Sequence, residues 1–194
     1  MNDAVTSRKK DDVKKKKRIS ALLEEARFVK NVLGKPKKAI NICDQILQVD
    51  PENRNALLIK AGGLHESSQV AEALEIIEHI IRRWPNHWEA YWLAALNHLG
   101  TEKDEESLLN IDKSIELDEN FDNVITKAQL LCLRGEPYER WLEKARMIDA
   151  ARTRNFMKSL WVKSMDDIEP SFADIFKFTL GRIREKAKQA FNKL

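Results

Sequence analysis

The fold is decided by KKAINICDQILQVDPEN (residues 37–53), which returns 34 positions later as AEALEIIEHIIRRWPNH (residues 71–87). The matching pairs are Ala39 with Ala73, Ile42 with Ile76, Ile46 with Ile80, and Pro51 with Pro85. A fixed period of this length is typical of proteins that stack one supersecondary unit many times. The period therefore predicts the architecture before any local element is assigned.

A third copy, EESLLNIDKSIELDENF (residues 105–121), has Ser107 at the small position. In every copy the apolar residues recur at helical spacing along one stripe, and a proline or turn ends the helix. The small residue allows a preceding helix to pack closely. Those preceding helices are expected at residues 20–34, 55–68 and 87–100. Each unit is therefore predicted to be a helical hairpin.

This pattern resembles the tetratricopeptide repeat family over residues 20 to about 121. The period, the small residue, the terminal proline and the helix pairing all correspond. The usual tryptophan and glycine of the first helices are missing. Leu23, Leu57 and Tyr91 stand at the large site, and Arg27, Ala61 and Ala95 at the glycine site. The resemblance implies an all-α fold: a right-handed α-solenoid of tetratricopeptide-type hairpins with a C-terminal helical cap.

The expected domain organisation follows from where the period begins and fails. Residues 1–19 are expected to form a basic, disordered and removable arm. The repeats are expected at residues 20–53, 54–87, 88–121 and, in degenerate form with Trp141 at the small site, 122–152. Residues 153–194 are expected to be capping helices, because terminal repeats are atypical.

Composition agrees with a helical protein. Charged residues make up 34% of the chain, with only 6 glycines and 5 prolines. Cys43 and Cys132 lie inside apolar helical patterns, which argues against a disulfide framework or a zinc site. The sequence has neither an apolar leader segment nor a run of the ~20 apolar residues that a membrane span needs. A cytoplasmic location is expected.

Charge is distributed unevenly. Residues 1–19 carry eight lysines or arginines against three aspartates, and residues 171–194 carry six cations against two carboxylates. The rest of the chain has 20 cations and 26 carboxylates, so basic ends flank an acidic body. The ends could bind an acidic partner or nucleic acid, fold back onto the body, or remain solvated.

The side chains with chemical potential do not form a catalytic pattern. The four histidines, His65, His79, His87 and His98, are scattered and lack a metal-binding spacing. Carboxylates such as Asp104 and Glu105 fit helix starts. The Gly62–Gly63 pair is interpreted as a packing notch. We expect no enzyme activity, no metal and no cofactor.

The resemblance implies that the first helices line a concave groove where a partner polypeptide binds. The groove residues it nominates are Phe28, Asn31, Asn55, Leu58, Ile59, His65, Glu89, Trp92, Leu93, Leu96, Lys127 and Leu130. Their apolar centre and polar rim favour an apolar helix or extended segment as ligand. The function expected is that of an interaction adaptor or chaperone-like scaffold. The clamp that some relatives use for a chaperone's terminal carboxylate is disfavoured, because Glu24 and Phe28 replace its first pair.

Two features leave alternatives open. The run WPNHWEAYW (residues 84–92) either cements the junction of the second and third repeats or presents Trp92 as a binding anchor. The basic amphipathic segment of residues 172–194 either caps the solenoid, occupies its groove, exchanges in a dimer, or lies on an anionic membrane. The alternative function is a nucleic-acid-associated helical repeat that uses the basic ends.

Overall fold

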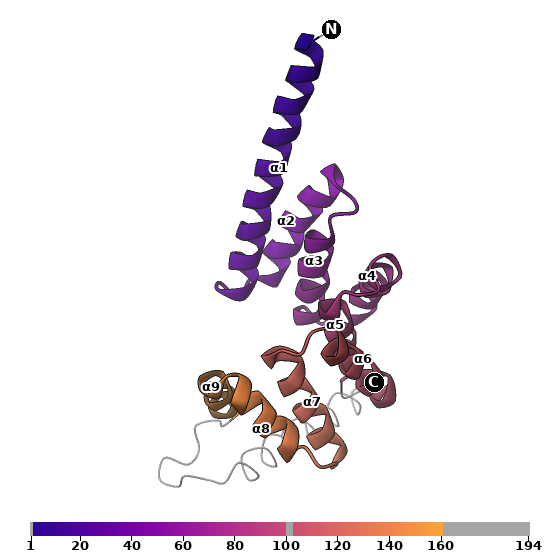
Figure 1. Cartoon of the computed structure of the whole chain (residues 1–194), viewed down its shortest axis with the longest axis vertical. Coiled ribbons are helices and arrows are strands. Elements are labelled where there is room, and N and C mark those ends of the chain that lie inside the picture. The colour runs from indigo at the N-terminus through magenta and orange to yellow at the C-terminus, as the bar shows by residue number, and fades with distance from the viewer. Residues whose placement is uncertain (1, 100–102, 161–194) are drawn as a thin grey trace. The chain divides into compact units, whose positions relative to one another are not determined.

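A computed structural model of the chain describes residues 2–99 and 103–160, and within these ranges every regular element is a helix (Figure 1). The helices are α1 (Asn2–Asn31), α2 (Pro36–Val49), α3 (Arg54–Glu66), α4 (Val70–Arg83), α5 (Trp88–His98), α6 (Asp104–Leu117), α7 (Phe121–Arg134), α8 (Glu139–Ile148) and α9 (Ala150–Leu160). The all-α solenoid class expected from the sequence is confirmed. No helix in the described ranges is both long and apolar enough to cross a membrane.

The chain divides into two compact units, Met1–His98 with α1 to α5 and Leu99–Leu194 with α6 to α9. In unit 1 each helix packs on the next along the chain, and α3 also contacts both α1 and α5. Pro36 occupies the first turn of α2, where its missing N–H costs nothing. Asn53 caps α3 by accepting a hydrogen bond from the Ala56 N–H at 3.1 Å.

The period of 34 residues is visible in the core of unit 1. Ala39 and Ala73, the small residues of the first two copies, are fully buried. They lie in two apolar clusters, one built around α1 to α3 and the other around α3 to α5. Ile42, Ile46 and Ile80 of the predicted stripe are buried as well. Ile76, which the period pairs with Ile42, is only partly buried, and its neighbour Ile77 enters the core instead.

Gly63 permits a close approach between α3 and α2. A Cβ atom at this position would lie 3.0 Å from Ile40 Cγ1 and 3.4 Å from the carbonyl oxygen of Pro36. The first distance is tighter than most packing contacts, so a larger residue would require Ile40 to yield by a few tenths of an ångström. The packing notch predicted for this glycine is therefore present.

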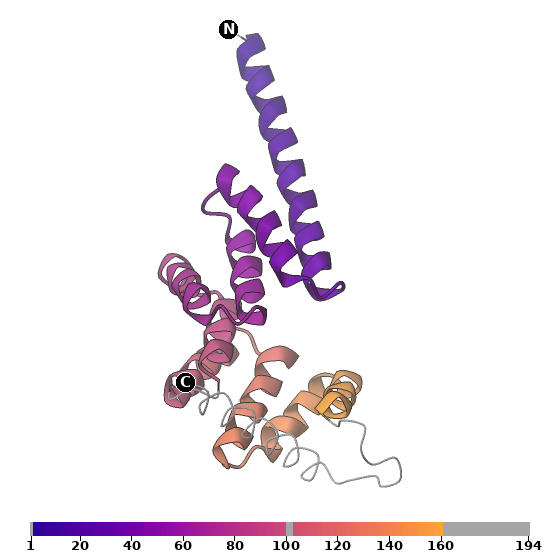
Figure 2. The same cartoon turned by 180° about the vertical axis from the view of Figure 1, so that it is seen from behind.

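The first helix differs from the sequence expectation at its N-terminal end. Residues 2–19, for which a disordered arm was expected, are the opening turns of α1. Lysine and arginine are good helix formers, and extending a helix already fixed by the core avoids the cost of nucleating a new one. Figures 1 and 2 show this half of α1 extending beyond the end of α2. That residues 1–18 can be removed without loss of fold stays a prediction.

In unit 2, α7 packs between α6 and α8, and α8 contacts α9. Its apolar cluster includes Phe121, Val124, Ala128, Leu142 and Met157. Ser107 and Ser114 of α6 are fully buried, as the third copy predicts for Ser107.

The degenerate fourth unit departs from its alignment. Trp141, aligned with the small residues, is only partly buried, and Leu142 beside it enters the core instead. The Trp141 ring lies under two ammonium groups, Lys127 Nζ at 4.5 Å and Lys144 Nζ at 5.1 Å from its centroid. The indole therefore forms a cation–π contact rather than filling a tight helix junction.

The predicted C-terminal cap lies mostly outside the described residues. Within them, α9 begins at Ala150, so the expected boundary at residue 153 falls inside a helix. The segments predicted as helices at residues 171–194 are not among the described residues.

Candidate functional site

The candidate site is the surface of unit 1 formed by α1, α3 and α5, which we call the first-helix face. Two polar contacts tie the three helices together. Lys30 Nζ on α1 donates to Glu66 Oε1 on α3 at 2.9 Å. His65 Nδ1 on α3 lies 3.2 Å from Asn97 Oδ1 on α5. The nominated residues that reach the surface of this face are Phe28, Asn31, Asn55, His65, Glu89, Trp92 and Leu96.

A small residue shapes the seam between α1 and α3. A Cβ atom at Gly62 would lie 3.6 Å from Lys30 Nζ and 3.9 Å from Leu93 Cδ2. These are ordinary contact distances, so the Lys30 side chain passes directly over Gly62 on its way to Glu66. Lys30 and Glu66 belong to the face although the sequence analysis did not nominate them.

Exposure separates the nominated residues into two groups. Phe28 is 53% exposed, and Asn31 and Asn55 are exposed as well. His65, Glu89, Trp92 and Leu96 are partly exposed. This group can meet a ligand without any rearrangement of the core.

The other group is buried, which corrects its placement on an open groove. Leu58, Ile59 and Leu93 are 4%, 6% and 4% exposed. For Leu58 and Ile59 the cause is the central position of α3, which packs against α1, α2, α4 and α5 and so has little free surface. Leu93 of α5 is buried in the apolar cluster that joins α3 to α5. The unbroken apolar run from Ala56 to Ile59 was the available signal, since four consecutive apolar residues are wider than the single stripe of a half-buried helix.

The last two nominated residues belong to unit 2. Leu130 is completely buried. Lys127 forms an ion pair with Asp112 and lies over the Trp141 ring. Both side chains are thus engaged in the packing of unit 2, and we do not assign them to the first-helix face.

Two exposed apolar residues near the end of α1 also escaped the sequence analysis. Val32 and Leu33 are 66% and 46% exposed. Phe28 and Val32 lie one helical turn apart, so their side chains are neighbours on the helix surface. The i, i+4 spacing of two large apolar residues outside the core stripe was the signal for them.

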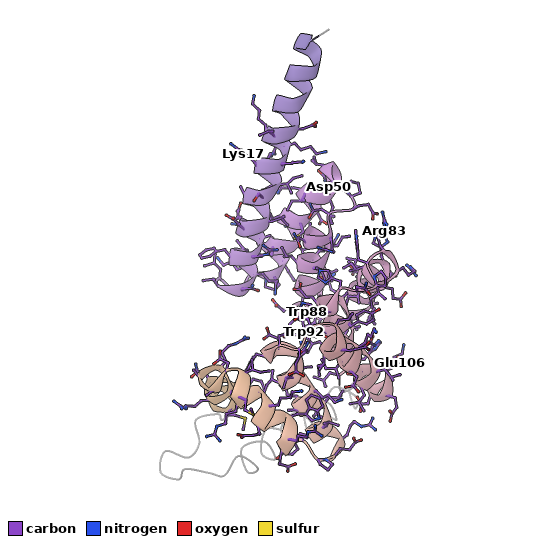
Figure 3. The ribbon with its side chains drawn as sticks, in the orientation of Figure 1. Lys17, Asp50, Arg83, Trp88, Trp92 and Glu106 are labelled. Atoms are coloured by element: carbon purple, nitrogen blue, oxygen red, sulfur yellow. The ribbon has the colours of Figure 1, made fainter. Side chains whose placement is uncertain are left out.

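The aromatic residues of α5 serve the junction between helices and also reach the surface. Trp88 and Trp92, labelled in Figure 3, have ring centroids 6.3 Å apart at an interplanar angle of 49°. Trp84 and Trp92 pack against the apolar cluster of α3 to α5, and Tyr91 donates from its hydroxyl to the Pro85 carbonyl oxygen at 3.1 Å. Trp92 is therefore partly a junction residue, and its surface edge is what remains for a ligand.

Three titratable groups outside the nominated set have pKa values shifted mainly by burial. Burial raises the pKa of Cys43 to about 12 and that of Cys132 to about 11, and both thiols are free. Burial, helped by the nearby Arg54 charge, lowers the pKa of His87. Among the described residues no group of three or more histidine, cysteine or acidic side chains could hold a metal ion.

Comparison with known proteins agrees with this architecture. Residues 33–99 match a family model described as tetratricopeptide repeat. TTC0263, a thermophilic TPR protein of Thermus thermophilus, has a similar structure with a TM-score of 0.63 and 15% identity, over 90% of this chain and 94% of that one. MamA (41-end) of Desulfovibrio magneticus RS-1 also has a similar structure, with a TM-score of 0.53 and 20% identity, over 73% of this chain and 76% of that one. No curated protein matches the sequence significantly. Residues 33–99 therefore match a tetratricopeptide repeat, and the helices share the fold of solved proteins such as TTC0263.

Proposed function

We propose that the chain is a protein-interaction scaffold that binds a partner polypeptide on the first-helix face of unit 1. The supporting observation is the exposed pair formed by Phe28, in the last turn of α1, and Val32, in the turn that follows it. The opposite side of the same helix, including Ala26 and Val29, is buried in the core. Apolar side chains exposed together on a surface are characteristic of interaction sites.

The chemistry of the face indicates the kind of ligand. Apolar area comes from Phe28 and Val32 at the end of the first helix and from Leu96 on α5, and Asn31 adds a polar group next to Phe28 on the helix surface. A ligand with an apolar edge and flanking polar groups would satisfy both parts, as an amphipathic helix or an extended segment does. A chaperone-like holding role would be one form of this activity. A cytoplasmic location, part of the same proposal, is consistent with the two free thiols.

Phage-displayed random peptides, panned against the full chain, would test the proposal. Clones specific for the face should lose most of their affinity when Phe28→Ser is introduced. A matched control is Leu109→Ser, which changes another highly exposed apolar residue in unit 2. If no selected clone distinguishes Phe28→Ser from Leu109→Ser, the proposed face is wrong.

Trp92→Ala then decides between the two roles of that residue. Truncation of a core tryptophan typically costs ~3 to 5 kcal/mol, whereas truncation of a surface anchor costs little stability. Because Trp92 packs against the apolar cluster, we expect a stability loss together with weaker peptide binding. Loss of stability with unchanged peptide binding would make Trp92 a junction residue only.

A further inference from the structure

A second candidate surface lies in unit 1, where the seam between α1 and α2 opens to solvent. A cleft of about 250 Å³ is present here. Its floor is apolar, with Ile19 and Leu22 from α1 and Val49 from α2. Its rim is basic, with Lys14, Lys15 and Arg18. We call it the basic cleft.

The cleft arises because α1 continues after its partner ends. The apolar stripe of α1 runs through Val29, Ala26 and Leu22 to Ile19, and α2 covers it as far as Val49. In the part of α1 that precedes Ile19, and that α2 does not cover, the same stripe carries Arg18 and Lys15 in place of apolar residues. Figure 3 labels Asp50, just past the end of α2, and Lys17 on the projecting part of α1. Val49 is left 50% exposed at the edge of the cleft.

The charge of the rim is not compensated within the described structure. Residues 12–18 read DVKKKKR, with five cations and one carboxylate, and all seven are exposed. None of the five cations forms an ion pair with a side chain that the structure describes. Like charges on adjacent turns of a helix repel one another, so negative charge brought to the rim would be favourable.

We propose that the basic cleft docks an acidic amphipathic segment of a partner protein. Apolar side chains of the segment would cover Ile19, Leu22 and Val49, and its carboxylates would approach Lys14, Lys15 and Arg18. The volume lies below the roughly 300 to 1,000 Å³ of a typical small-molecule pocket, and it suits a few side chains. This surface is separate from the first-helix face, so the inference does not rest on the proposed function.

Other occupants fit these observations less well. Nucleic acid would use the cations but leave the apolar floor uncovered. An anionic membrane calls for a broad apolar face, and Val13 is the single apolar residue among residues 12–18. The chain's own residues 171–194 carry a net positive charge and would be repelled by the rim.

The helix supplies its own matched control for the experiment. Lys14→Glu/Lys15→Glu reverses two charges on the rim, and Lys16→Glu/Lys17→Glu reverses two charges that do not line the cleft. Both double variants change the net charge equally. A random peptide library displayed on phage would be panned against the full chain, and the Kd of each selected peptide measured by fluorescence anisotropy with the wild-type chain and both variants.

We expect a class of peptides that combines acidic and apolar residues. Lys14→Glu/Lys15→Glu should weaken these peptides by ~10-fold or more, and Lys16→Glu/Lys17→Glu by less than ~3-fold. Val49→Ser should also weaken them, and Val70→Ser, at another exposed valine, should not. Absence of any peptide with this dependence would overturn the proposal.

Three parallel measurements test the competing occupants with the same variants. If a thymidine oligonucleotide or a phosphatidylserine vesicle binds the rim more tightly than the peptides do, the ligand of the cleft is nucleic acid or membrane, and the proposal of a partner segment is wrong. Sedimentation equilibrium tests a second copy of the chain. Self-association that is lost in Lys14→Glu/Lys15→Glu but kept in Lys16→Glu/Lys17→Glu would equally overturn the assignment.

Discussion

Unit 1 fills its interior with aliphatic side chains, whereas unit 2 places hydrogen-bonding side chains at its helix junctions. In unit 1 the described residues with buried side chains are apolar except Asn97. The corresponding part of unit 2 buries Ser107, Ser114, Asn123, Thr126 and Thr153. The family match at residues 33–99 lies almost entirely in unit 1, where the apolar period is intact.

Asn123 shows how unit 2 replaces apolar packing. Its Nδ2 donates to the Asp118 carbonyl oxygen at 2.6 Å and to Ser114 Oγ at 3.2 Å. Its Oδ1 accepts from the Asn120 N–H at 3.0 Å, which completes a capping box at the start of α7. Apolar side chains determine how closely helices pack, but directional hydrogen bonds also fix their register. The comparison teaches that the same kind of helix stack can be specified by apolar packing, as in unit 1, or by buried hydrogen bonds, as in unit 2.

Each unit contains one buried cysteine, so the comparison can be measured unit by unit. Cys43 reports on unit 1 and Cys132 on unit 2, and these are the only cysteines of the chain. Their raised pKa values keep both thiols protonated at neutral pH, and burial hides them from reagents. Labelling with a thiol reagent across a denaturant titration should therefore give a separate free energy of unfolding for each unit.

The largest effect is expected from Leu58→Glu. Leu58 is 4% exposed in the apolar cluster of unit 1, and an unpaired carboxylate there should cost ~4 kcal/mol or more. Cys43 should become reactive without denaturant. The control is Asn55→Glu, an exposed position in the first turn of the same helix, where a carboxylate suits the helix dipole. Protection of Cys43 equal in the two variants would contradict the buried position of Leu58.

Ala73→Leu should destabilise unit 1 by overfilling a helix junction. Ala73 is fully buried between packed helices, and extra methylene groups in such a site typically cost ~1 to 3 kcal/mol. The denaturant midpoint of Cys43 labelling would measure the loss. Ala71→Leu, at an exposed position of the same helix, should change stability by less than ~0.5 kcal/mol. A neutral Ala73→Leu would mean that the helix pairing is incorrect.

Asn123→Ala should destabilise unit 2 by about as much as Ala73→Leu destabilises unit 1, but through lost hydrogen bonds. The substitution leaves the Asp118 carbonyl oxygen and the Asn120 N–H without this partner. Groups that lose a buried hydrogen bond typically lower the free energy of unfolding by ~1 to 3 kcal/mol. The shift should appear in Cys132 labelling. Asn110→Ala, which removes an exposed hydrogen bond to Glu106, is the control. If the two substitutions have equal effects, the polar junction is not what holds unit 2.

The smallest effect is a pH dependence that only unit 1 should show. The lowered pKa of His87 means that the unfolded chain binds a proton more readily than the folded one. Stability should therefore fall as the pH decreases below about 6.5, the ordinary histidine pKa, toward the folded pKa. Cys43 labelling should shift to lower denaturant between pH 7.5 and 5.5. All four histidines lie in unit 1, so Cys132 labelling should carry no histidine contribution.

His87→Gln isolates this contribution. The variant should lose less stability on acidification than the wild-type chain, because glutamine binds no proton. Arg54→Gln should have an intermediate effect, since the Arg54 charge is the second cause of the lowered pKa after burial. An unchanged pH profile in His87→Gln would assign the dependence to another group.

The sequence predicted the helices well because each is marked by its own local pattern. Stripes such as Ile42, Cys43 and Ile46, and breaks such as Pro51, require no knowledge of the neighbouring repeats. The candidate face was predicted less well. Whether Leu58 or Leu93 is open to a ligand depends on how many helices surround α3 and α5, and that number is a property of the stack. Trp141 departed from its alignment because Lys127 and Lys144, on two different helices, together cover its ring.

The close contact at Gly63 has a geometric consequence for the whole of unit 1. Helices pack ~8 to 10 Å apart, so a displacement of a few tenths of an ångström at one contact is equivalent to a rotation of about 2° between neighbouring hairpins. In a stacked array such rotations accumulate from one hairpin to the next and set the curvature. Gly63 lies at the contact between α3 and α2, so its lack of a side chain bears on the angle between the two hairpins that carry α1 and α3. If Ile40 did not move aside, a methyl group there would change the curvature of the first-helix face and leave its chemistry unaltered.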